Sequence, residues 1–418
     1  MSLFIRNAIL DDEPTNVQCA DGVIASIGVG LRAAPGDEIV DATGLHITPG
    51  MVNGHGHAAM VLLRGYGDDM ALRPWLHERI WPAEARMTAD DILWGARLAC
   101  LEMIRSGTTS MWDMYWHPAS TARAATELGM RATLGAVVFD GCDPDASADA
   151  CAAAAAQLDE IQSFGGLIGA SVAAHSVYMV SRQSLEWSRD ECERREIPLQ
   201  IHCSETEVEV TDCVTATGMT PAAYLDDIGA LCGSTLLAHG TFLTDREIES
   251  VSRSGATVVT NPVSNMKLAV GRAAPVARMM AAGVALGLGT DGASSNNSLD
   301  MFTDMKAMAT LAKHATGDPA ALSAIDALAI ARGQRSALLA GRAIAVGAPA
   351  DFVLVDLRTP ELCIGDVSAA LAYAANGHCV DTTVIAGRVA MRHRHIPDAD
   401  AIVGEASARA RSLTGARR

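Results

Sequence analysis

Residues 51–57 read MVNGHGH, an apolar start followed by two histidines, His55 and His57, that are separated by one glycine. In a β-strand, the side chains of residues i and i+2 lie on the same face. If this stretch ends a strand, both imidazoles can therefore reach one metal ion. The motif predicts a metal site at the end of a buried strand.

Three more apolar runs further along the chain also end in a histidine or an acid. PLQIHC carries His202, TLLAHG carries His239 and VALGLGTDG leads to Asp291. Three imidazoles and one carboxylate suit Zn²⁺, and Fe²⁺ is the alternative. The expected metal ligands are His55, His57, His202 and Asp291. His239 is either a further ligand or a group that orients the attacking water from just outside the ligand set.

Eight short β-rich runs occur between residue 48 and about residue 300, with helical segments between them. Near-continuous apolar runs are typical of strands that are buried on both faces. Eight such strands alternating with helices predict an α/β fold, the (β/α)8 or TIM barrel, whose catalytic groups lie at the carboxyl ends of the strands. The runs are ITPGMVNG, TTSMWDMYW, RATLGAVVF, LIGASVAAHSVY, PLQIHC, STLLAHG, ATVVTNPV and VALGLGTDG.

The segments between and around these runs complete the expected organisation. TADDILWGARLACLEMIRSG begins with a capping threonine, has apolar residues at helical spacing and closes at Gly107, so it predicts a helix. Both ends of the chain contain short alternating strands, which predict a small β-sandwich domain. We expect this domain to combine residues 1–47 with 345–392, around a catalytic barrel at 48–344. Residues 305–342 and a C-terminal segment, 393–418, are expected to be helical.

The composition narrows the class of partner. The chain has 418 residues, is 49% hydrophobic and has a formal net charge of -17. It can bury a large core but offers no broad basic surface, so we expect a small-molecule substrate and neither polymeric nucleic acid nor a membrane as partner. Its ten cysteines contain no C-x-x-C pair, and the N-terminal segment is too polar for a signal peptide, so we expect a cytoplasmic protein.

Hydrolysis at such a centre needs two proton carriers, because the water loses a proton and the leaving group gains one. A bound metal ion lowers the pKa of its water towards neutrality. Asp291, at the metal, is placed to accept the proton of the water. Glu205 follows His202 by three residues, so it lies near the metal without having to bind it and can carry a proton to the substrate.

The order of the segments PGMVNGHGH, IHCSE, LLAHG and GTDG resembles the amidohydrolase superfamily over essentially the whole chain. Members with two metal ions usually bridge them with a carboxylated lysine at the end of the fourth strand. Here that strand reads ASVAAHSVY, and the first lysine of the chain is Lys267. The resemblance therefore implies one divalent metal ion per subunit.

Within the superfamily, the chain is similar to the deaminases of 5'-methylthioadenosine and S-adenosylhomocysteine. The matching segments are LLRGYGDDMALRPWLHERIWPAEARMTADD, AAHSVY, HCSETEVEV, NPVSNMKLAVG and TDGASSNNSLDMF. The resemblance implies a homo-oligomer in which Glu84 holds the ribose hydroxyls while His175 and Ser295 contact the purine. It also assigns the metal ligands as above and implies a catalytic trio of Glu205, His239 and Asp291.

The residues around Glu84 agree with a nucleoside site. A carboxylate can accept both hydroxyls of a ribose diol, and Trp75 and Trp81 suit the covering of a nucleoside. The alternative is that Glu84 is an exposed acid ahead of the helix that begins near Thr88.

The positions of the arginines indicate which 5' substituent the site would prefer. Relatives that accept S-adenosylhomocysteine bind its carboxylate through arginines, and Arg131 is the candidate here, with no further arginine before Arg182. We therefore expect adenosine, 5'-deoxyadenosine or 5'-methylthioadenosine to be preferred over S-adenosylhomocysteine.

Two other functions are compatible with the same barrel. A deaminase or chlorohydrolase of a free aminoheterocycle, such as a triazine or a guanine-type base, would use the same metal and acids but would leave Glu84 without a diol. A non-catalytic metal-binding barrel would typically lack a ligand or an acid, and none is missing here.

Overall fold

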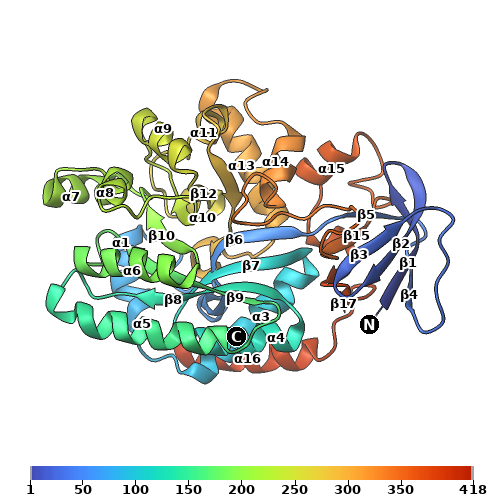
Figure 1. Cartoon of the computed structure of the whole chain (residues 1–418), viewed down its shortest axis with the longest axis horizontal. Helices are drawn as coiled ribbons and strands as arrows, with labels where there is room; N and C mark the ends of the chain where they lie inside the picture. Colours follow the sequence, from blue (N-terminus) through green and yellow to red (C-terminus); the bar gives the residue numbers. More distant parts are fainter. Residues whose placement is uncertain (1, 416–418) are drawn as a thin grey trace.

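The computed structural model describes residues 2–415, whose larger sheet is parallel and closes on itself. β13 and β14 are two halves of one stretch: β13 pairs with β12, and β14 pairs with β6. Eight strand segments therefore form the predicted (β/α)8 barrel, which lies at the centre of Figure 1. Its strands are β6 (Met51–His57), β7 (Thr108–Met114), β8 (Arg131–Val138), β9 (Ile168–Ser176), β10 (Leu199–Cys203), β11 (Thr235–His239), β12 (Thr257–Thr260), β13 (Ala285–Leu288) and β14 (Asp291–Gly292).

Helices alternate with these strands, and the first long one confirms its predicted limits. Thr88 caps α3 (Ala89–Arg105): its hydroxyl accepts the Asp91 N–H at 3.2 Å, and its own N–H donates to the Asp91 carboxylate at 2.9 Å. Such a reciprocal capping box stabilises a helix start. The other helices include α4 (Pro118–Leu128), α5 (Ser147–Gln162), α6 (Arg182–Arg195), α7 (Glu207–Thr217), α8 (Pro221–Asp227), α9 (Asp245–Ser254), α10 (Pro262–Lys267), α11 (Val276–Ala281), α12 (Ala293–Asn296), α13 (Met301–Thr316), α14 (Ala324–Ala331) and α15 (Val367–Tyr373).

The smaller sheet joins the two ends of the chain, as predicted. β5 (Leu45–Pro49) and β15 (Phe352–Asp356) pair antiparallel at its centre. The strand order is β17-β16-β15-β5-β1-β2-β3, and β4 pairs parallel with the first half of β1, outside this order. The sheet lies at the right of Figure 1. Its remaining strands are β1 (Ser2–Leu10), β2 (Glu13–Ala20), β3 (Val23–Ile27), β4 (Glu38–Asp41), β16 (Val380–Ile385) and β17 (Arg388–Met391).

The predicted first barrel strand, ITPGMVNG, is divided between the two sheets. β5 ends at Pro49 in the small sheet, and β6 begins at Met51 in the barrel. Between them, a Cβ atom on Gly50 would lie 2.2 Å from the Thr109 side chain, so only glycine fits there. The small sheet thus extends two residues past the expected limit at residue 47. The division of the chain into regions 1–47, 48–344, 345–392 and 393–418 stays a prediction.

The C-terminal helix α16 (Ala399–Thr414) supports the segment that carries Glu84. Arg409 on α16 contacts Asp91 at the start of α3 at 2.8 Å. Arg86 donates to the Leu413 carbonyl oxygen at 2.7 Å. These contacts tie α16 to both sides of the loop between α2 (Trp81–Glu84) and α3.

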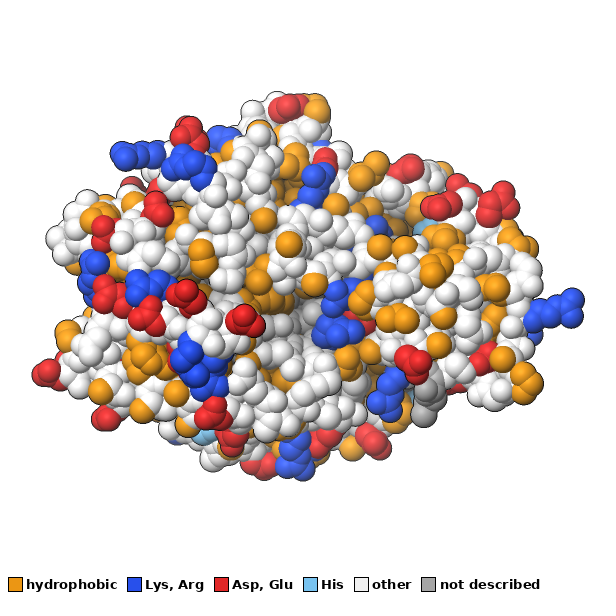
Figure 2. Space-filling view, viewed as in Figure 1, with side chains coloured by type: hydrophobic (Ala, Val, Ile, Leu, Met, Phe, Trp, Pro, Cys, Tyr) orange, Lys and Arg blue, Asp and Glu red, His pale blue; other side chains and the backbone are white. Residues whose placement is uncertain are grey.

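The surface carries mixed charges. On the face that Figure 2 shows, lysine and arginine side chains lie singly or in small groups among acidic ones. Within residues 2–415, none of the helices is both long and apolar enough to cross a membrane.

Candidate metal centre and active site

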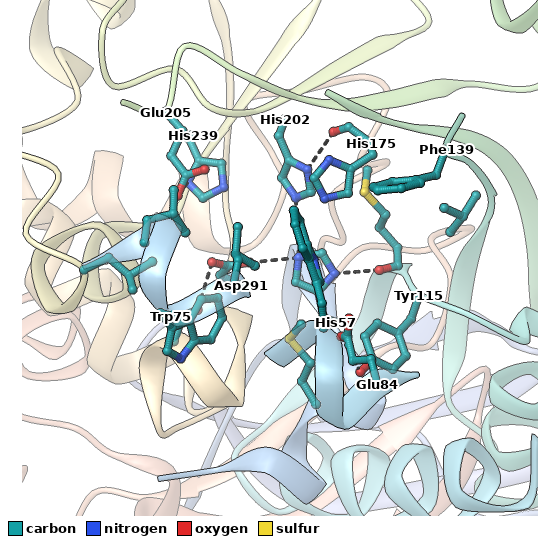
Figure 3. Close-up of a pocket in the computed structure, with 18 of the residues that line it drawn as sticks. His57, Trp75, Glu84, Tyr115, Phe139, His175, His202, Glu205, His239 and Asp291 are labelled. Carbon is teal, nitrogen blue, oxygen red and sulfur yellow. Dashed lines mark hydrogen bonds and ion pairs between the residues drawn. The ribbon is translucent and has the colours of Figure 1, made fainter. Parts of the chain in front are cut away.

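The predicted ligands meet at the carboxyl ends of their strands. His57 Nε2 lies 3.0 Å from Asp291 Oδ1, and His55 Nε2 lies 3.6 Å from the same oxygen. His202 Nε2 lies 3.4 Å from His57 Nε2. Figure 3 shows His57, His202 and Asp291 converging from different strands, with His239 nearby. Residues that are far apart in the sequence therefore share one buried centre.

Five side chains lie close enough to this centre to be metal ligands. One ligand atom each from His55, His202, His239 and Asp291 lies within 4.8 Å of all the others, a grouping that holds His239 rather than His57. His57, however, lies closer to Asp291 than His55 does, with its Nε2 at 3.0 Å from Oδ1 against 3.6 Å for His55. Both histidines are therefore available to a single ion.

Three of these histidines have their protons fixed by oxygen acceptors. A carbonyl oxygen can only accept, so in each pair Nδ1 carries a hydrogen and Nε2 is the nitrogen left to face a metal ion. Metal-binding histidines in proteins are usually oriented in this way. The pairs are His57 with the Met114 carbonyl oxygen at 2.6 Å, His202 with the His175 carbonyl oxygen at 2.7 Å and His239 with Asn265 Oδ1 at 2.8 Å.

His55 provides the test of whether a cation fits here. Its side chain is fully buried, and among the described residues neither of its ring nitrogens has a hydrogen-bond partner. Burial lowers the pKa of His55 to about 4, so its imidazole is neutral. A buried nitrogen without a partner is costly, and a metal ion would satisfy it. The donor set therefore fits a divalent cation.

Asp291 supplies the negative charge of the centre. It adopts a left-handed backbone conformation with φ 59° at the turn that ends the eighth strand. The Ser264 and Ser295 hydroxyls lie 2.6 and 3.0 Å from its Oδ2, which leaves Oδ1 to face the histidines. Burial lowers the pKa of His57, but the hydrogen bond and charge of Asp291 outweigh this effect and raise it to about 9. The same negative field favours a divalent cation.

Glu205 lies beside this centre without a close contact to it. The carboxylate is buried, and its Oε1 lies 3.9 Å from His239 Nδ1. Burial raises the pKa of Glu205 above its usual range, which suits a group that has to hold and release a proton. In Figure 3, Glu205 and His239 lie on one side of the cluster, and Glu84 lies on the other.

The loop that carries Glu205 is held by Glu209, a residue that the sequence analysis did not single out. The Glu209 carboxylate accepts the Ser204 N–H at 2.9 Å and the Glu205 N–H at 2.7 Å. Ser204 has a φ of 54°, in the left-handed region that disfavours most L-residues. Glu209 therefore stabilises the turn that aims Glu205 into the pocket.

Glu84 lines the pocket opposite Glu205. It is the last residue of α2, is half-buried and accepts a hydrogen bond from the Tyr115 hydroxyl at 2.8 Å. Burial raises the pKa of Glu84. The alternative of an exposed acid at a helix start is therefore wrong, since Glu84 ends α2 and lines the active-site pocket beside Tyr115 and Trp116.

The remaining predicted pocket residues occupy the walls. His175, Trp81 and Ser295 all line the same cavity as the metal centre. Burial lowers the pKa of His175 to about 3, so its ring is a neutral hydrogen-bonding group, and it stands edge-on to Phe139 with the ring centroids 5.4 Å apart. The cavity is thus lined by aromatic rings with a few polar groups, as small-molecule sites commonly are.

Arg131 is the exception, and its predicted contact with the substrate is wrong. It is the first residue of β8, so it lies at the amino end of the strand, opposite the metal centre. Its guanidinium donates to Asp351 at 2.8 and 3.1 Å. Because both carboxylate oxygens hold it there, Arg131 joins the barrel to the small sheet and does not reach the pocket.

Other residues of the site were missed because their role depends on contacts across the fold. Asn265 and Glu209 stand within the quoted segments NPVSNMK and HCSETEVEV, yet only the structure places Asn265 on His239 and Glu209 on the Glu205 loop. Asp113 accepts the Ala58 N–H at 2.6 Å, just after His57. No local pattern marks these buried hydrogen bonds.

Comparisons with known proteins agree with this geometry. The 5'-deoxyadenosine deaminase of Methanoregula boonei is 43% identical over 94% of this chain and 91% of its own. The 5-methylthioadenosine/S-adenosylhomocysteine deaminase of Halobacterium salinarum is also 43% identical, over 94% of this chain and 92% of its own. The crystal structure of an adenosine deaminase from Xanthomonas campestris with bound zinc is 33% identical, covers 99% of both chains and has a TM-score of 0.92. The profile of the amidohydrolase family matches residues 46–390, and the chain belongs to this family.

Proposed function

We propose that the protein is a metal-dependent deaminase that converts an adenine nucleoside to the corresponding inosine-type nucleoside and ammonia. The observation that carries this proposal is the placement of Glu205 and Glu84 on opposite sides of one histidine-rich centre (Figure 3). The names of the relatives, deaminases of 5'-deoxyadenosine, 5'-methylthioadenosine, S-adenosylhomocysteine and adenosine, support it.

The metal would be held by His55, His57, His202 and Asp291, with His239 beside them. The donor set of neutral imidazoles and one carboxylate suits zinc, and the zinc in the Xanthomonas campestris structure supports that choice over iron. When bound, such an ion acts as a Lewis acid and lowers the pKa of water.

The proton transfers fall to two acids of this chain. Asp291 accepts the proton of the attacking water, and Glu205 delivers a proton to N1 of the purine. Water adds at C6 to give a tetrahedral carbon. The amino nitrogen then takes the proton held by Asp291, the bond from C6 to nitrogen breaks and ammonia leaves. The hydroxyl proton returns to Glu205, and the oxygen stays on the ring as a carbonyl. His239, whose Nδ1–H is held by Asn265, turns Nε2 towards the attacking water and orients it by accepting a hydrogen bond.

The substrate is oriented by the opposite wall. Glu84 accepts the ribose hydroxyls, and Tyr115 keeps its carboxylate in place. Neutral His175 and the Trp81 ring contact the base and sugar. Ser295 holds Asp291 and lies near the purine.

Turnover by the purified protein tests the proposal. We expect the zinc-loaded protein to deaminate adenosine, 5'-deoxyadenosine or 5'-methylthioadenosine, followed by ammonia release and the ultraviolet change from adenine to hypoxanthine. Chelation should abolish turnover, and added Zn²⁺ should restore it. Glu205→Gln should keep the metal and lower kcat by about 10²-fold or more. Activity on a triazine or a free base alone would overturn the assignment of Glu84, and bound zinc without any turnover would indicate a non-catalytic barrel.

The location of the enzyme in the cell and its oligomeric state stay predictions. All ten cysteines lie within residues 2–415 and are unpaired, which supports a cytoplasmic location. The expected homo-oligomer rests on the family resemblance, and sedimentation of the purified protein would test it.

A further inference from the structure

A second cavity adjoins the active-site pocket. It has a volume of about 670 Å³ and shares Leu72, Leu76, Trp81, Tyr178 and Leu268 with the pocket. None of the metal-centre residues lines it. We call this cavity the outer chamber. The five shared residues form the boundary between it and the active-site pocket.

If the protein carries out the proposed reaction, the position of the substrate shows which part of it reaches the outer chamber, so this inference rests on the proposed function. With C6 of the purine at the metal centre and the ribose hydroxyls on Glu84, the 5' carbon is the part of the nucleoside that lies beyond the sugar. Trp81, on α2 with Glu84, lines both cavities, so the 5' substituent of a ribose held by Glu84 enters the outer chamber.

The charges around the outer chamber are mostly negative. Glu207, Glu209 and Asp212 line it, all from α7. Arg73 is the one lysine or arginine among its described lining residues, and no lysine or arginine lines the active-site pocket. The Arg73 guanidinium is already paired with the Asp212 carboxylate. A negatively charged 5' substituent would therefore meet acids and no free cation.

The other walls of the outer chamber are apolar. Val177, Met179 and Val270 contribute to them, together with the shared residues Leu72 and Leu268. A 5'-methyl or methylthio group gains free energy by leaving water for such a surface. A carboxylate instead loses its hydration without gaining a partner.

We propose that the outer chamber selects adenine nucleosides with an uncharged 5' substituent and discriminates against those that carry a carboxylate there. Asp212 enforces this choice, because it occupies the one guanidinium that could bind the carboxylate. The amino group of S-adenosylhomocysteine can face the acids of α7, but its carboxylate has no partner.

The ratio of kcat/KM for S-adenosylhomocysteine to that for 5'-methylthioadenosine tests the proposal. In the zinc-loaded wild-type protein we expect this ratio to be about 0.1 or lower. Asp212→Ala should release Arg73 and raise the ratio about tenfold, and Arg73→Ala in the Asp212→Ala background should cancel the gain. The matched control is Asp245→Ala, an exposed acid that is paired with Arg278 outside both cavities and should leave the ratio unchanged.

Binding measurements keep the test independent of turnover. Calorimetry on Glu205→Gln should give a lower Kd for 5'-methylthioadenosine than for S-adenosylhomocysteine, and the difference should shrink as salt is added. Equal or tighter binding of S-adenosylhomocysteine, or an unchanged ratio in folded Asp212→Ala, would overturn the role of the outer chamber. Loss of turnover on every nucleoside, with this binding preference intact, would count against the proposed reaction only.

Discussion

Single protons and single lone pairs decide what the metal centre can do. His239 can present Nε2 to the centre because its Nδ1–H is held by the Asn265 oxygen. The nitrogen of the Asn265 amide in turn donates to the Thr241 hydroxyl at 2.9 Å, which holds the amide in this orientation. A chain of two hydrogen bonds thus sets the tautomer of the His239 imidazole before any ligand binds.

Glu209 gives the sharpest prediction for a single residue. Glu209→Gln replaces one of two acceptor oxygens by a donor that faces a backbone N–H, so the turn at Ser204 and Glu205 has to move. We expect kcat to fall about 10- to 100-fold with a smaller change in KM, because a small misplacement of a proton donor is costly. Steady-state kinetics, with zinc content measured on the same sample, checks this.

Glu247→Gln is the matched control for that prediction. Glu247 is equally buried and accepts the Thr244 N–H at 2.9 Å at the start of α9, away from the pocket. Its variant should lose stability by about 1–3 kcal/mol but keep kcat. If both variants lost kcat in proportion to stability, Glu209 would have no positioning role.

At the scale of the elements, the closure of the barrel and the metal site depend on the same pair of strands. β14 lies beside β6, with Asp291 opposite Gly56. Asn53 on β6 donates to the Thr290 hydroxyl at 2.8 Å and accepts the Thr290 N–H at 3.1 Å. One buried amide therefore fixes Asp291 relative to His55 and His57.

Replacing this amide should loosen the centre. Asn53→Ala leaves the Thr290 N–H and hydroxyl without their partner, which should cost about 2–4 kcal/mol of stability and weaken zinc binding. Competition with a chelator measures the second effect. The control is Asn16→Ala, whose side chain also accepts a backbone N–H and donates to backbone carbonyls, but in the small sheet. Equal zinc affinity in the two variants would contradict the link between barrel closure and metal binding.

The elements also mark how far the sequence could predict the structure. The barrel strands were predicted correctly, and the polar residues at their ends do meet at one centre, because buried parallel strands leave a local apolar pattern and their polar residues stand out at the ends. ITPGMVNG was divided because apolar character does not reveal where a chain passes from one sheet to another. Arg131 was misplaced because its partner, Asp351, lies 220 residues away. Its position at the start of a strand already indicated that it lies at the opposite end of the barrel from the site.

At the scale of the whole molecule, the ion pair of Arg131 with Asp351 joins the barrel to the small sheet. Asp351 precedes β15, is fully buried and accepts hydrogen bonds from Arg131 of the barrel, from Arg342 at 2.8 Å and from the Ala386 N–H at 2.7 Å. Burial alone would raise the pKa of Asp351, but the hydrogen bonds and charges of Arg131 and Arg342 outweigh it and lower the pKa.

This lowered pKa predicts how stability depends on pH. A carboxyl whose pKa is lower in the folded than in the unfolded state stabilises the fold fully above its unfolded pKa, about 4, and loses that contribution as the pH falls through its folded pKa. Asp351→Asn should therefore cost about 3–5 kcal/mol near pH 7 and progressively less below pH 4, in denaturant unfolding at each pH. Asp41→Asn, which removes the exposed pair with Arg6, should cost far less. A pH-independent difference between wild type and Asp351→Asn would mean that the charge of Asp351 does not hold the barrel to the small sheet.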